Sequence, residues 1–408
     1  MAIFLTANLF YRLGIRVAAP ILLMTMTINR SAAVPLLSTD TGPPQKRASG
    51  KEMKDLQAIH AAADPSIRLD RIEQHLSKYP KSSYRTDLLR MAIGAYSQVN
   101  NHGKAVESAE KLLTEPIEST LKAGLYAQLT FSYSRLDNHA KSIEFGERLL
   151  SEFPDSPQRE DTMEVLAFEY RKSNDLIRSI DYAERFVKEY PKSRSLGNVY
   201  RLAMFNFQAL NNPAKCAEFG ERLLEVKPGD VETLTMLAYF YGESARWEEA
   251  ADRSQEALDL IDKAADPPTD LSPERWKRVR QNWKARNFST LGACHLHRGN
   301  SLTSKEAKKM AFEDAVINFK NALSINPRDD ISYLRMGLTY EFMEDWEGAQ
   351  DAYAAAVALA QPSTSGHAGR ALQAVYKRLH RNSLEGMETL IQKAEQKLKT
   401  ATDAITQP

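Results

Sequence analysis

AKSIEFGERLLSEFP, residues 140–154, returns almost unchanged as AKCAEFGERLLEVKP, residues 214–228. Ten of the fifteen positions are identical, and the two copies begin 74 residues apart. Composition alone does not produce so long a match, so the chain contains internal repeats. A repeat of fixed length predicts an array of similar structural units, and it has to be recognised before any other fold is assigned.

The spacing between units is half of that distance, 37 residues. A ring marks each unit, which we call the ring position: Tyr96, Tyr133, Tyr170, Phe207, Tyr241, His295 and Tyr340. A small side chain follows in the second half of each unit, which we call the small position: Ala105, Ser142, Ser179, Cys216, Ala250, Ala315 and Ala349. Polar turns separate the two positions, and proline-bearing loops end most units. This order predicts a helix, a turn, a second helix and a stop.

The residue types suit that geometry. Two antiparallel helices joined by a short turn approach closely only where a small side chain faces the partner helix. A single pair cannot bury its apolar face, so neighbouring pairs must stack into a continuous core. The sequence therefore predicts an all-α protein built as a solenoid.

These residues resemble the tetratricopeptide repeat (TPR) family. One unit places large, large, small, aromatic, small and small side chains as that motif requires: Leu234, Leu237, Ala238, Tyr241, Ala250 and Ala257. The resemblance implies a right-handed α-solenoid of about eight helix pairs over residues 51–361, starting near residues 49, 86, 123, 160, 197, 231, 285 and 330. In the first, degenerate pair, Ile59 and Ile72 are the best anchors. The seventh pair should carry an elongated insert, about residues 262–312, and residues 362–408 should form a capping helical pair and tail.

Two features depart from the usual pattern of the family. Units of 37 residues exceed the usual length of about 34, and they are similar to the units of periplasmic TPR proteins that assemble the outer membrane. Glycine stands at positions 146 and 220, where the family often has an aromatic side chain. Gly146 and Gly220 therefore predict closer packing of their helices.

The N-terminus has the layout of a secretory signal. Arg12 and Arg16 precede an apolar run over residues 17–28, and the small residues 31–33 follow as a cleavage site. We expect a signal peptide over residues 1–33, a flexible linker over 34–50, and a periplasmic or secreted protein. The absence of a cysteine near that cut excludes a bacterial lipoprotein anchor. A mitochondrial transit peptide and a cytoplasmic protein are the alternatives left open.

The charge and the motifs of the sequence argue against catalysis and against metal or cofactor binding. The net charge is +1, and two cysteines are too few for a disulfide scaffold. The stretch Cys294-His295-Leu296-His297 suggests a metal site, but His295 occupies a ring position. Only Cys294 and His297 share a helical face, and zinc needs three or four protein ligands. No phosphate-binding loop or catalytic motif is found, so we expect no catalytic residue, metal or cofactor and no enzymatic activity.

The remaining candidates for a functional site are surfaces that could bind another molecule. The first helices of such pairs line a concave groove, where the family usually binds a partner protein or an extended peptide. Two residues before four ring positions stand further aromatic residues: Phe131, Phe168, Phe205 and Tyr239. Arginines lie on the same helices: Arg90, Arg135, Arg171 and Arg201. Aromatic residues with arginine predict a protein-binding groove, although the same rings could instead pack between first helices. The Lys/Asn pattern that clamps a C-terminal carboxylate is missing, with Ala127 and Glu164 standing there.

A second candidate surface is the basic segment 273–286. It carries Arg275, Trp276, Arg278, Arg280, Trp283 and Lys284 against the single acid Glu274. Such a helix could bind an acidic partner, a membrane surface or nucleic acid. More often such a pattern is a solvated charged face whose tryptophans pack on the companion helix, here the one from Ser304 onward. The alternative to a groove-binding scaffold is therefore an adaptor for a polyanion, a membrane surface or nucleic acid.

Overall fold

A computed structural model describes residues 49–263, 272–359 and 365–406. The expected signal peptide and nearly all of the expected linker lie outside these residues. Within the described ranges the regular structure is helical, with 18 α-helices and no strand. None of these helices combines the length and the apolar character needed to cross a membrane. The chain divides at residues 206 and 207 into two compact units, which we describe separately.

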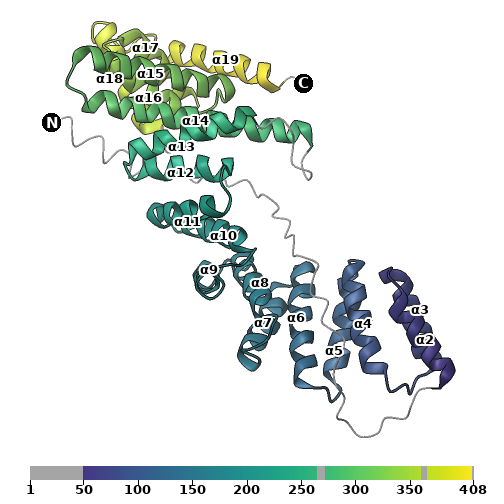
Figure 1. Cartoon of the computed structure of the whole chain (residues 1–408). Helices are drawn as coiled ribbons and strands as arrows, with labels where there is room; N and C mark the ends of the chain where they lie inside the picture. The colour runs from purple at the N-terminus through teal and green to yellow at the C-terminus, as the bar shows by residue number, and fades with distance from the viewer. Residues whose placement is uncertain (1–48, 264–271, 360–364, 407–408) are drawn as a thin grey trace. The chain divides into compact units, whose positions relative to one another are not determined.

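The first unit consists of helix pairs up to residue 206 (Figure 1). Its helices are α2 (Gly50–Ala61), α3 (Pro65–Lys78), α4 (Arg85–Gln98), α5 (His102–Leu113), α6 (Ser119–Arg135), α7 (His139–Glu152), α8 (Arg159–Lys172), α9 (Leu176–Glu189) and most of α10 (Leu196–Ala209). In the first pair, Ile59 and Ile72 are almost fully buried, as predicted. They pack with Leu88 of α4, so the degenerate pair shares a core with the next one.

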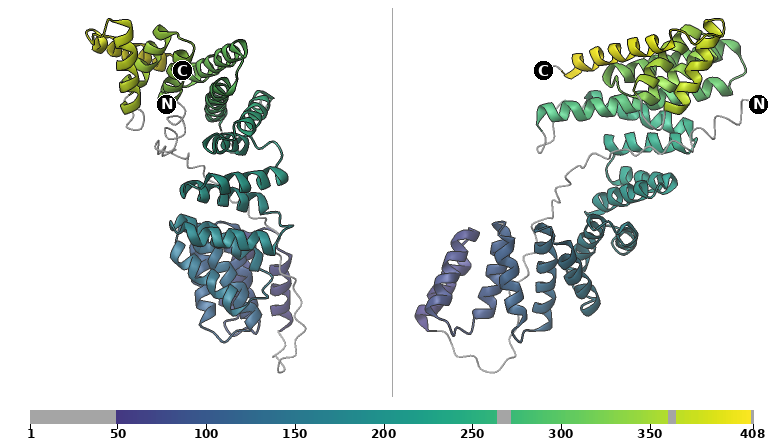
Figure 2. Two further views of the ribbon diagram at one scale, coloured as in Figure 1. Left: turned by 90° about the vertical axis from the view of Figure 1, so that its left-hand side faces the viewer. Right: turned by 180° about the vertical axis from the view of Figure 1, so that it is seen from behind.

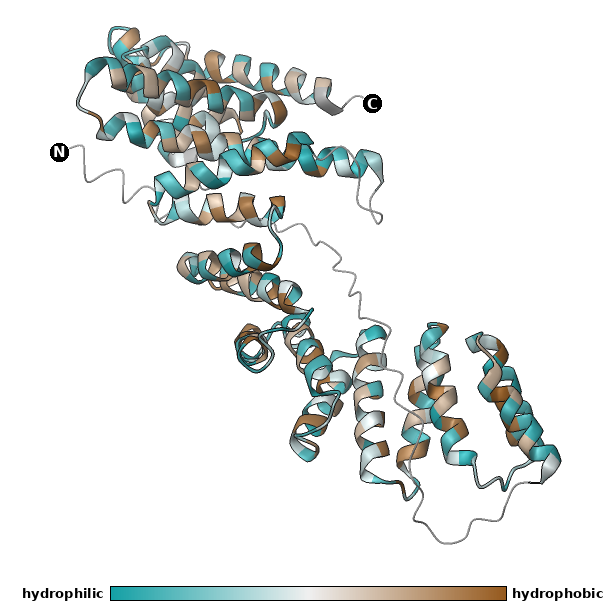
Figure 3. Cartoon of the chain, in the orientation of Figure 1, coloured by the Kyte–Doolittle hydropathy of each residue, from teal (hydrophilic) through white to brown (hydrophobic). Residues whose placement is uncertain are grey.

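The second unit continues the alternation from residue 207, and Figure 2 shows its helices from two further sides. Its helices after α10 are α11 (Pro213–Val226), α12 (Val231–Glu243), α13 (Trp247–Lys263), α14 (Pro273–Ser301), α15 (Lys305–Ile325), α16 (Asp330–Phe342), α17 (Trp346–Ala358), α18 (Ser365–Leu379) and α19 (Met387–Thr406). Hydrophobic and hydrophilic residues alternate around most helices of each unit (Figure 3). This alternation is that of amphipathic helices packed on one side.

The turn inside each pair is fixed by left-handed backbone geometry. The residue four after the ring position has a positive φ in four successive pairs: Asn100, Asp137, Asn174 and Asn211. Asparagine and aspartate tolerate this conformation better than most residues. The next residue caps the second helix; in α7 the Asn138 side chain accepts from the Lys141 backbone N–H. The Asn138 backbone N–H donates to the carbonyl of Tyr133 over 2.9 Å. The polar turns therefore join the end of the first helix to the start of the second.

The small position is the best-protected place in the array. All seven small side chains are fully buried: Ala105, Ser142, Ser179, Cys216, Ala250, Ala315 and Ala349. Where the residue is serine, its hydroxyl donates to a carbonyl of the first helix, as from Ser142 to Thr130 over 2.8 Å. The predicted close approach of the paired helices is confirmed. The ring position is more variable, because Tyr133 and Tyr170 are buried whereas His295 is half-buried.

Tyrosine hydroxyls join successive pairs, a feature that sequence analysis missed. Four of the five ring tyrosines donate to a glutamate on the second helix of the preceding pair. The bonds are Tyr96–Glu73 at 2.9 Å, Tyr133–Glu110 at 2.5 Å, Tyr170–Glu147 at 2.6 Å and Tyr241–Glu221 at 2.6 Å. Hydrogen bonds to a charged acceptor are stronger than neutral ones, so these bonds help to fix the register between pairs.

Two glycines allow second helices to approach the next first helix. A Cβ atom added to Gly146 would lie 2.8 Å from Leu166, and one added to Gly220 would lie 2.7 Å from Leu237. Both leucines are fully buried and have little room to move. The closer packing predicted from these glycines is therefore present.

We expect Gly220→Ala to lower the free energy of unfolding by about 1–3 kcal/mol, because the new methyl group overpacks the contact with Leu237. Gly124→Ala is the matched control, since a Cβ atom there meets nothing within 4 Å. That change should be neutral or stabilise by up to about 1 kcal/mol, because glycine disfavours a helix. Urea unfolding followed by circular dichroism measures both. Equal effects of the two changes would contradict the tight contact.

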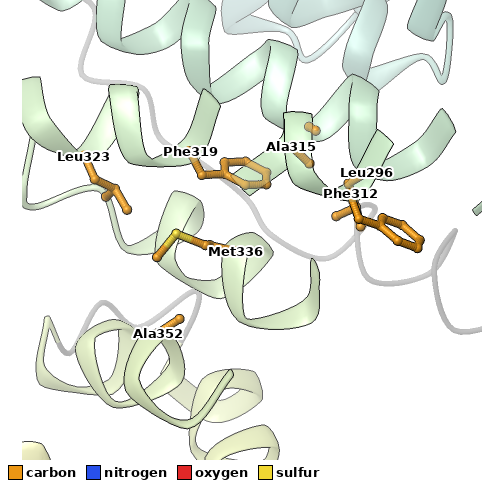
Figure 4. Packing of buried hydrophobic residues seen from close by; sticks show 8 residues of the cluster. Leu296, Phe312, Ala315, Phe319, Leu323, Met336 and Ala352 are labelled. Carbon is orange, nitrogen blue, oxygen red and sulfur yellow. The ribbon is translucent and has the colours of Figure 1, made fainter. Parts of the chain in front are cut away.

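The longest pair is α14 with 29 residues and α15 with 21 residues. The two helices meet where glycines of α14 face rings of α15: a Cβ atom on Gly292 would lie 2.7 Å from Phe319, and one on Gly299 would lie 2.4 Å from Phe312. These rings belong to a core cluster that continues into α16 and α17 (Figure 4). The long pair is thus packed into the array through the C-terminal half of α14.

The last two helices cover α17. Leu372 and Val375 of α18 are almost fully buried against it, and Leu390 and Ala394 of α19 pack on the same cluster. The covered face of α17 is rich in alanine. Ala354 stands five residues after the small position, where α5, α7 and α11 carry the glutamates that accept tyrosine hydroxyls. At this position α17 therefore differs from α5, α7 and α11.

Candidate functional site

In the first unit, the structure separates the three aromatic residues that precede ring positions. Phe131 of α6 and Phe205 of α10 are half-buried. Phe168 of α8 has only 7% of its surface exposed. The prediction that all of these rings line an open groove is therefore wrong for Phe168, whose ring belongs to the core.

Phe131 is held in place by the first residue of α5. His102 begins α5, is buried, and meets the Phe131 ring edge-on with centroids 5.6 Å apart. Burial and the charge of Arg135 lower the pKa of His102, so its imidazole is neutral at pH 7. Arg135 itself is exposed beside this pair. The result is a positioned ring with a cation close by.

Phe205 is held in a comparable way by Arg171. The Arg171 guanidinium lies 5.8 Å from the centre of the Phe205 ring, and it donates to the side-chain oxygen of Asn206. Asn206 is fully buried and donates in turn to Ser179 over 2.7 Å. Burial lowers the pKa of Arg171. Arg171 therefore positions Phe205 and links three helices, in addition to offering part of its surface to solvent.

The other predicted arginines of this unit take different places. Arg90 of α4 is half-buried and lies 3.8 Å from the carboxylate of Asp87. Arg201 of α10 is half-buried. The partly exposed cations are thus spread over several first helices and do not form one cluster.

Two buried carboxylates lie behind this surface, and neither was predicted. Glu169 is fully buried. Its carboxylate accepts a hydrogen bond from Ser134 at 2.8 Å, lies 2.7 Å from the His139 ring nitrogen and forms an ion pair with Lys172 at 3.1 Å. Glu164 accepts from Ser195 over 2.6 Å and from Asn198 over 3.3 Å. Hydrogen bonds of this kind compensate for part of the cost of burying a charge. Both carboxylates tie α8 to its neighbours.

Burial raises the pKa of Glu164 above its ordinary value of 4.5, although its two hydrogen bonds act in the opposite direction. In the folded state Glu164 therefore holds its proton at pH values where the unfolded chain has lost it. The contribution of Glu164 to stability falls as the pH rises from about 4.5 through its folded pKa.

We expect Glu164→Gln to flatten this part of the pH dependence and to raise stability near pH 7 relative to the wild type. The difference in urea-unfolding free energy between variant and wild type, measured at several pH values, tests this. Glu107→Gln is the control, because Glu107 is exposed on α5. A difference that does not change with pH would contradict the assignment.

In the second unit, Tyr239 is the aromatic residue at the corresponding place on α12. It is half-buried, and burial raises its pKa to about 12. Three charged side chains act on its hydroxyl: Glu243 of α12, Arg286 of α14 and Arg335 of α16. α14 packs against both α12 and α16, so first helices of three successive pairs lie next to one another in this region.

The basic segment of α14 divides into a buried and an exposed side. Trp276 is buried and meets the half-buried Trp283 in a T-shaped contact at 5.5 Å. The Arg280 guanidinium lies 5.8 Å over Trp276, and Lys284 pairs with Asp262 of α13. Arg275 and Arg278 are exposed. The prediction that Trp276 belongs to a binding surface is wrong, because the ring anchors the helix.

The side chains of Cys294, His295 and His297 make packing contacts within the fold. Cys294 is buried, and burial raises the pKa of its thiol to about 12. His295 is half-buried 3.9 Å from Asp314, and His297 stacks on Trp247 at 4.8 Å. Among the residues that the structure describes, no three potential ligands gather into a metal site.

Helix pairs with a buried small position, a ring position and a capped left-handed turn recur through both units. The chain has the tetratricopeptide-repeat fold. No model of a protein family matches its sequence, and no curated protein does.

Solved structures with this fold are similar to it. A tetratricopeptide repeat protein from Parabacteroides merdae is 14% identical, with 71% of this chain and 99% of that chain covered at a TM-score of 0.43. A thermophilic TPR protein of Thermus thermophilus is 20% identical, covering 52% and 98% at 0.35. The Cut9–Hcn1 hetero-tetramer of the APC/C matches at 12% identity, covering 79% and 55% at 0.37. At these identities the likeness concerns the fold alone.

Proposed function

We propose that this chain is a non-enzymatic scaffold whose first helices bind a segment of a partner protein. The observation that carries the proposal is the state of Phe131 and Phe205. Each ring is partly exposed, and each is fixed by a defined contact with His102 or Arg171. Large rings beside arginine are the residue types that dominate protein-binding hot spots. The tetratricopeptide-repeat fold commonly mediates protein–protein interaction, which supports the same conclusion.

Rigidity is the physical advantage of this arrangement. The rings stand on helices that are held to their neighbours by buried polar contacts such as Arg171–Asn206 and Ser134–Glu169. The surface is therefore ordered before a partner arrives. Only the bound segment has to lose conformational entropy, and preorganisation of this kind favours affinity.

The double variant Phe131→Ala/Phe205→Ala tests the proposal. Because the loss of one hot-spot ring of about 2 kcal/mol already weakens binding about thirtyfold, partner capture should fall at least that far. The melting temperature should change by only a few degrees, since both rings are half-buried. Pull-down from a lysate of the source organism, read by mass spectrometry, measures capture.

Leu136→Ala/Ile177→Ala is the matched control. It also removes two large apolar side chains, which are 47% and 68% exposed. Partners captured by the wild type and the control, and lost by the ring variant, would support the proposal. Unchanged capture by the ring variant would contradict it, and a large loss of stability would assign these rings to the core.

We also propose that the chain is exported. The basic residues Arg12 and Arg16, the apolar run 17–28 and the small residues 31–33 support a cleaved signal peptide. We expect N-terminal mass spectrometry of the periplasmic or secreted fraction to find mature protein beginning at Val34. Recovery of only full-length protein from the cytosol would contradict export.

A further inference from the structure

The exposed side of α14 carries a row of arginines. Arg275, Arg278 and Arg286 recur at intervals of three and eight residues, and Asn282 stands between the last two. At 3.6 residues per turn these intervals place all four side chains along one side of the helix. All four are exposed. We call Arg275, Arg278 and Arg286 the arginine stripe.

Several surface cations on second helices are paired with acids: Lys141 with Glu144 at 2.8 Å, Lys215 with Glu218 at 2.8 Å, and Arg253 with Glu221 at 2.8 Å. On α14 itself, Lys284 lies on another side of the helix and pairs with Asp262 of α13. Within the described part of the chain, no ion pair engages a guanidinium of the stripe. Three guanidinium charges therefore lie along one side of α14 without an acid of the described residues paired to them.

The stripe ends where α14 packs on α12, because Asn287, the residue after Arg286, donates to Thr235 of α12 over 2.8 Å. α14 extends past the end of α12, as Figures 1 and 2 both show. Its last stripe residue, Arg286, lies close enough to the Tyr239 hydroxyl to act on it electrostatically, as does Arg335. Tyr239 stands one helical turn after Thr235 on α12, so a ligand lying along the stripe would reach this half-buried aromatic ring.

We propose that the arginine stripe and Tyr239 together bind an acidic segment of a partner protein. A guanidinium presents a planar fork of donors that fits a carboxylate bidentately. Three such forks along about 16 Å of helix, at 1.5 Å rise per residue, suit a segment with several Asp or Glu side chains. This inference rests on the proposed protein-binding function and adds the class of partner.

Two other polyanions fit the geometry less well. Single-stranded nucleic acid binds where bases stack on exposed rings, but both tryptophans of this segment lie away from the stripe, Trp276 buried and Trp283 half-buried. A helix that lies on a membrane needs a large apolar face. In residues 273–286 the large apolar side chains are buried or half-buried. Charge without an exposed ring or apolar face favours an acidic protein segment.

The test uses the full chain and an array of peptides of about fifteen residues that differ in acidic content at constant aromatic content. Acidic peptides should bind best, and their binding should weaken about tenfold between about 50 mM and about 300 mM salt because ions screen exposed charges. Peptide binding without any acidic preference would overturn this inference and leave the proposed function standing. No binding to any peptide would count against both.

Variants locate the site. We expect Arg275→Gln/Arg278→Gln/Arg286→Gln to weaken binding of a labelled oligo-glutamate peptide at least about tenfold, because charge-assisted hydrogen bonds to carboxylates are stronger than neutral ones. Lys305→Gln/Lys308→Gln/Lys309→Gln removes the same charge from the start of α15 and should change binding less than about twofold. Fluorescence anisotropy measures both variants.

Equal losses in the two variants would show diffuse attraction and overturn the site. Tighter binding of oligo-uridylate RNA or of phosphatidylglycerol vesicles than of the oligo-glutamate peptide would overturn the assignment of the partner class. Circular dichroism confirms that each variant keeps its helices, so a loss of binding cannot be attributed to unfolding.

Discussion

The whole array depends on the contact at the small position, where two antiparallel helices approach each other. Seven side chains no larger than cysteine or serine are completely shielded from water there. A larger residue would separate the paired helices, and the ring position would lose the surface on which it packs. Every other feature is built on this distance. The capped turn spans it, and the hydroxyl bonds to the preceding pair require that rings emerge at a constant place.

The contacts that the sequence predicts well are those set within a few residues. The polar turn at Asp137 follows because aspartate and asparagine tolerate a positive φ better than most residues, and the buried Ser142 follows from sterics inside one pair. Both recur at a constant interval, so each copy supports the others. Repetition converted weak local preferences into a firm prediction of the fold.

The candidate site was predicted less well, because it depends on how neighbouring pairs meet. Phe168 and Phe205 occupy equivalent positions in the sequence, yet one is buried and the other is half-exposed. The role of Arg171 depends on Asn206, which lies 35 residues away in the sequence and belongs to no motif that would predict the contact. Trp276 was predicted to lie on a binding surface because its helix is basic. In the structure it lies on the apolar side of that helix, where it is buried and contacts Trp283. Such outcomes are decided by tertiary contacts, which periodicity does not encode.

The alanine-rich face of α17 has a consequence for assembly. Stacked repeats are open-ended by nature, and an exposed last pair would offer the next molecule the same surface that each pair offers its neighbour. Unlimited head-to-tail polymerisation is the hazard of that geometry. Ala354 provides no carboxylate for an incoming tyrosine, and α18 and α19 already occupy the face around it. At this end the fold terminates its own growth, so a filament cannot extend from it without first displacing two helices.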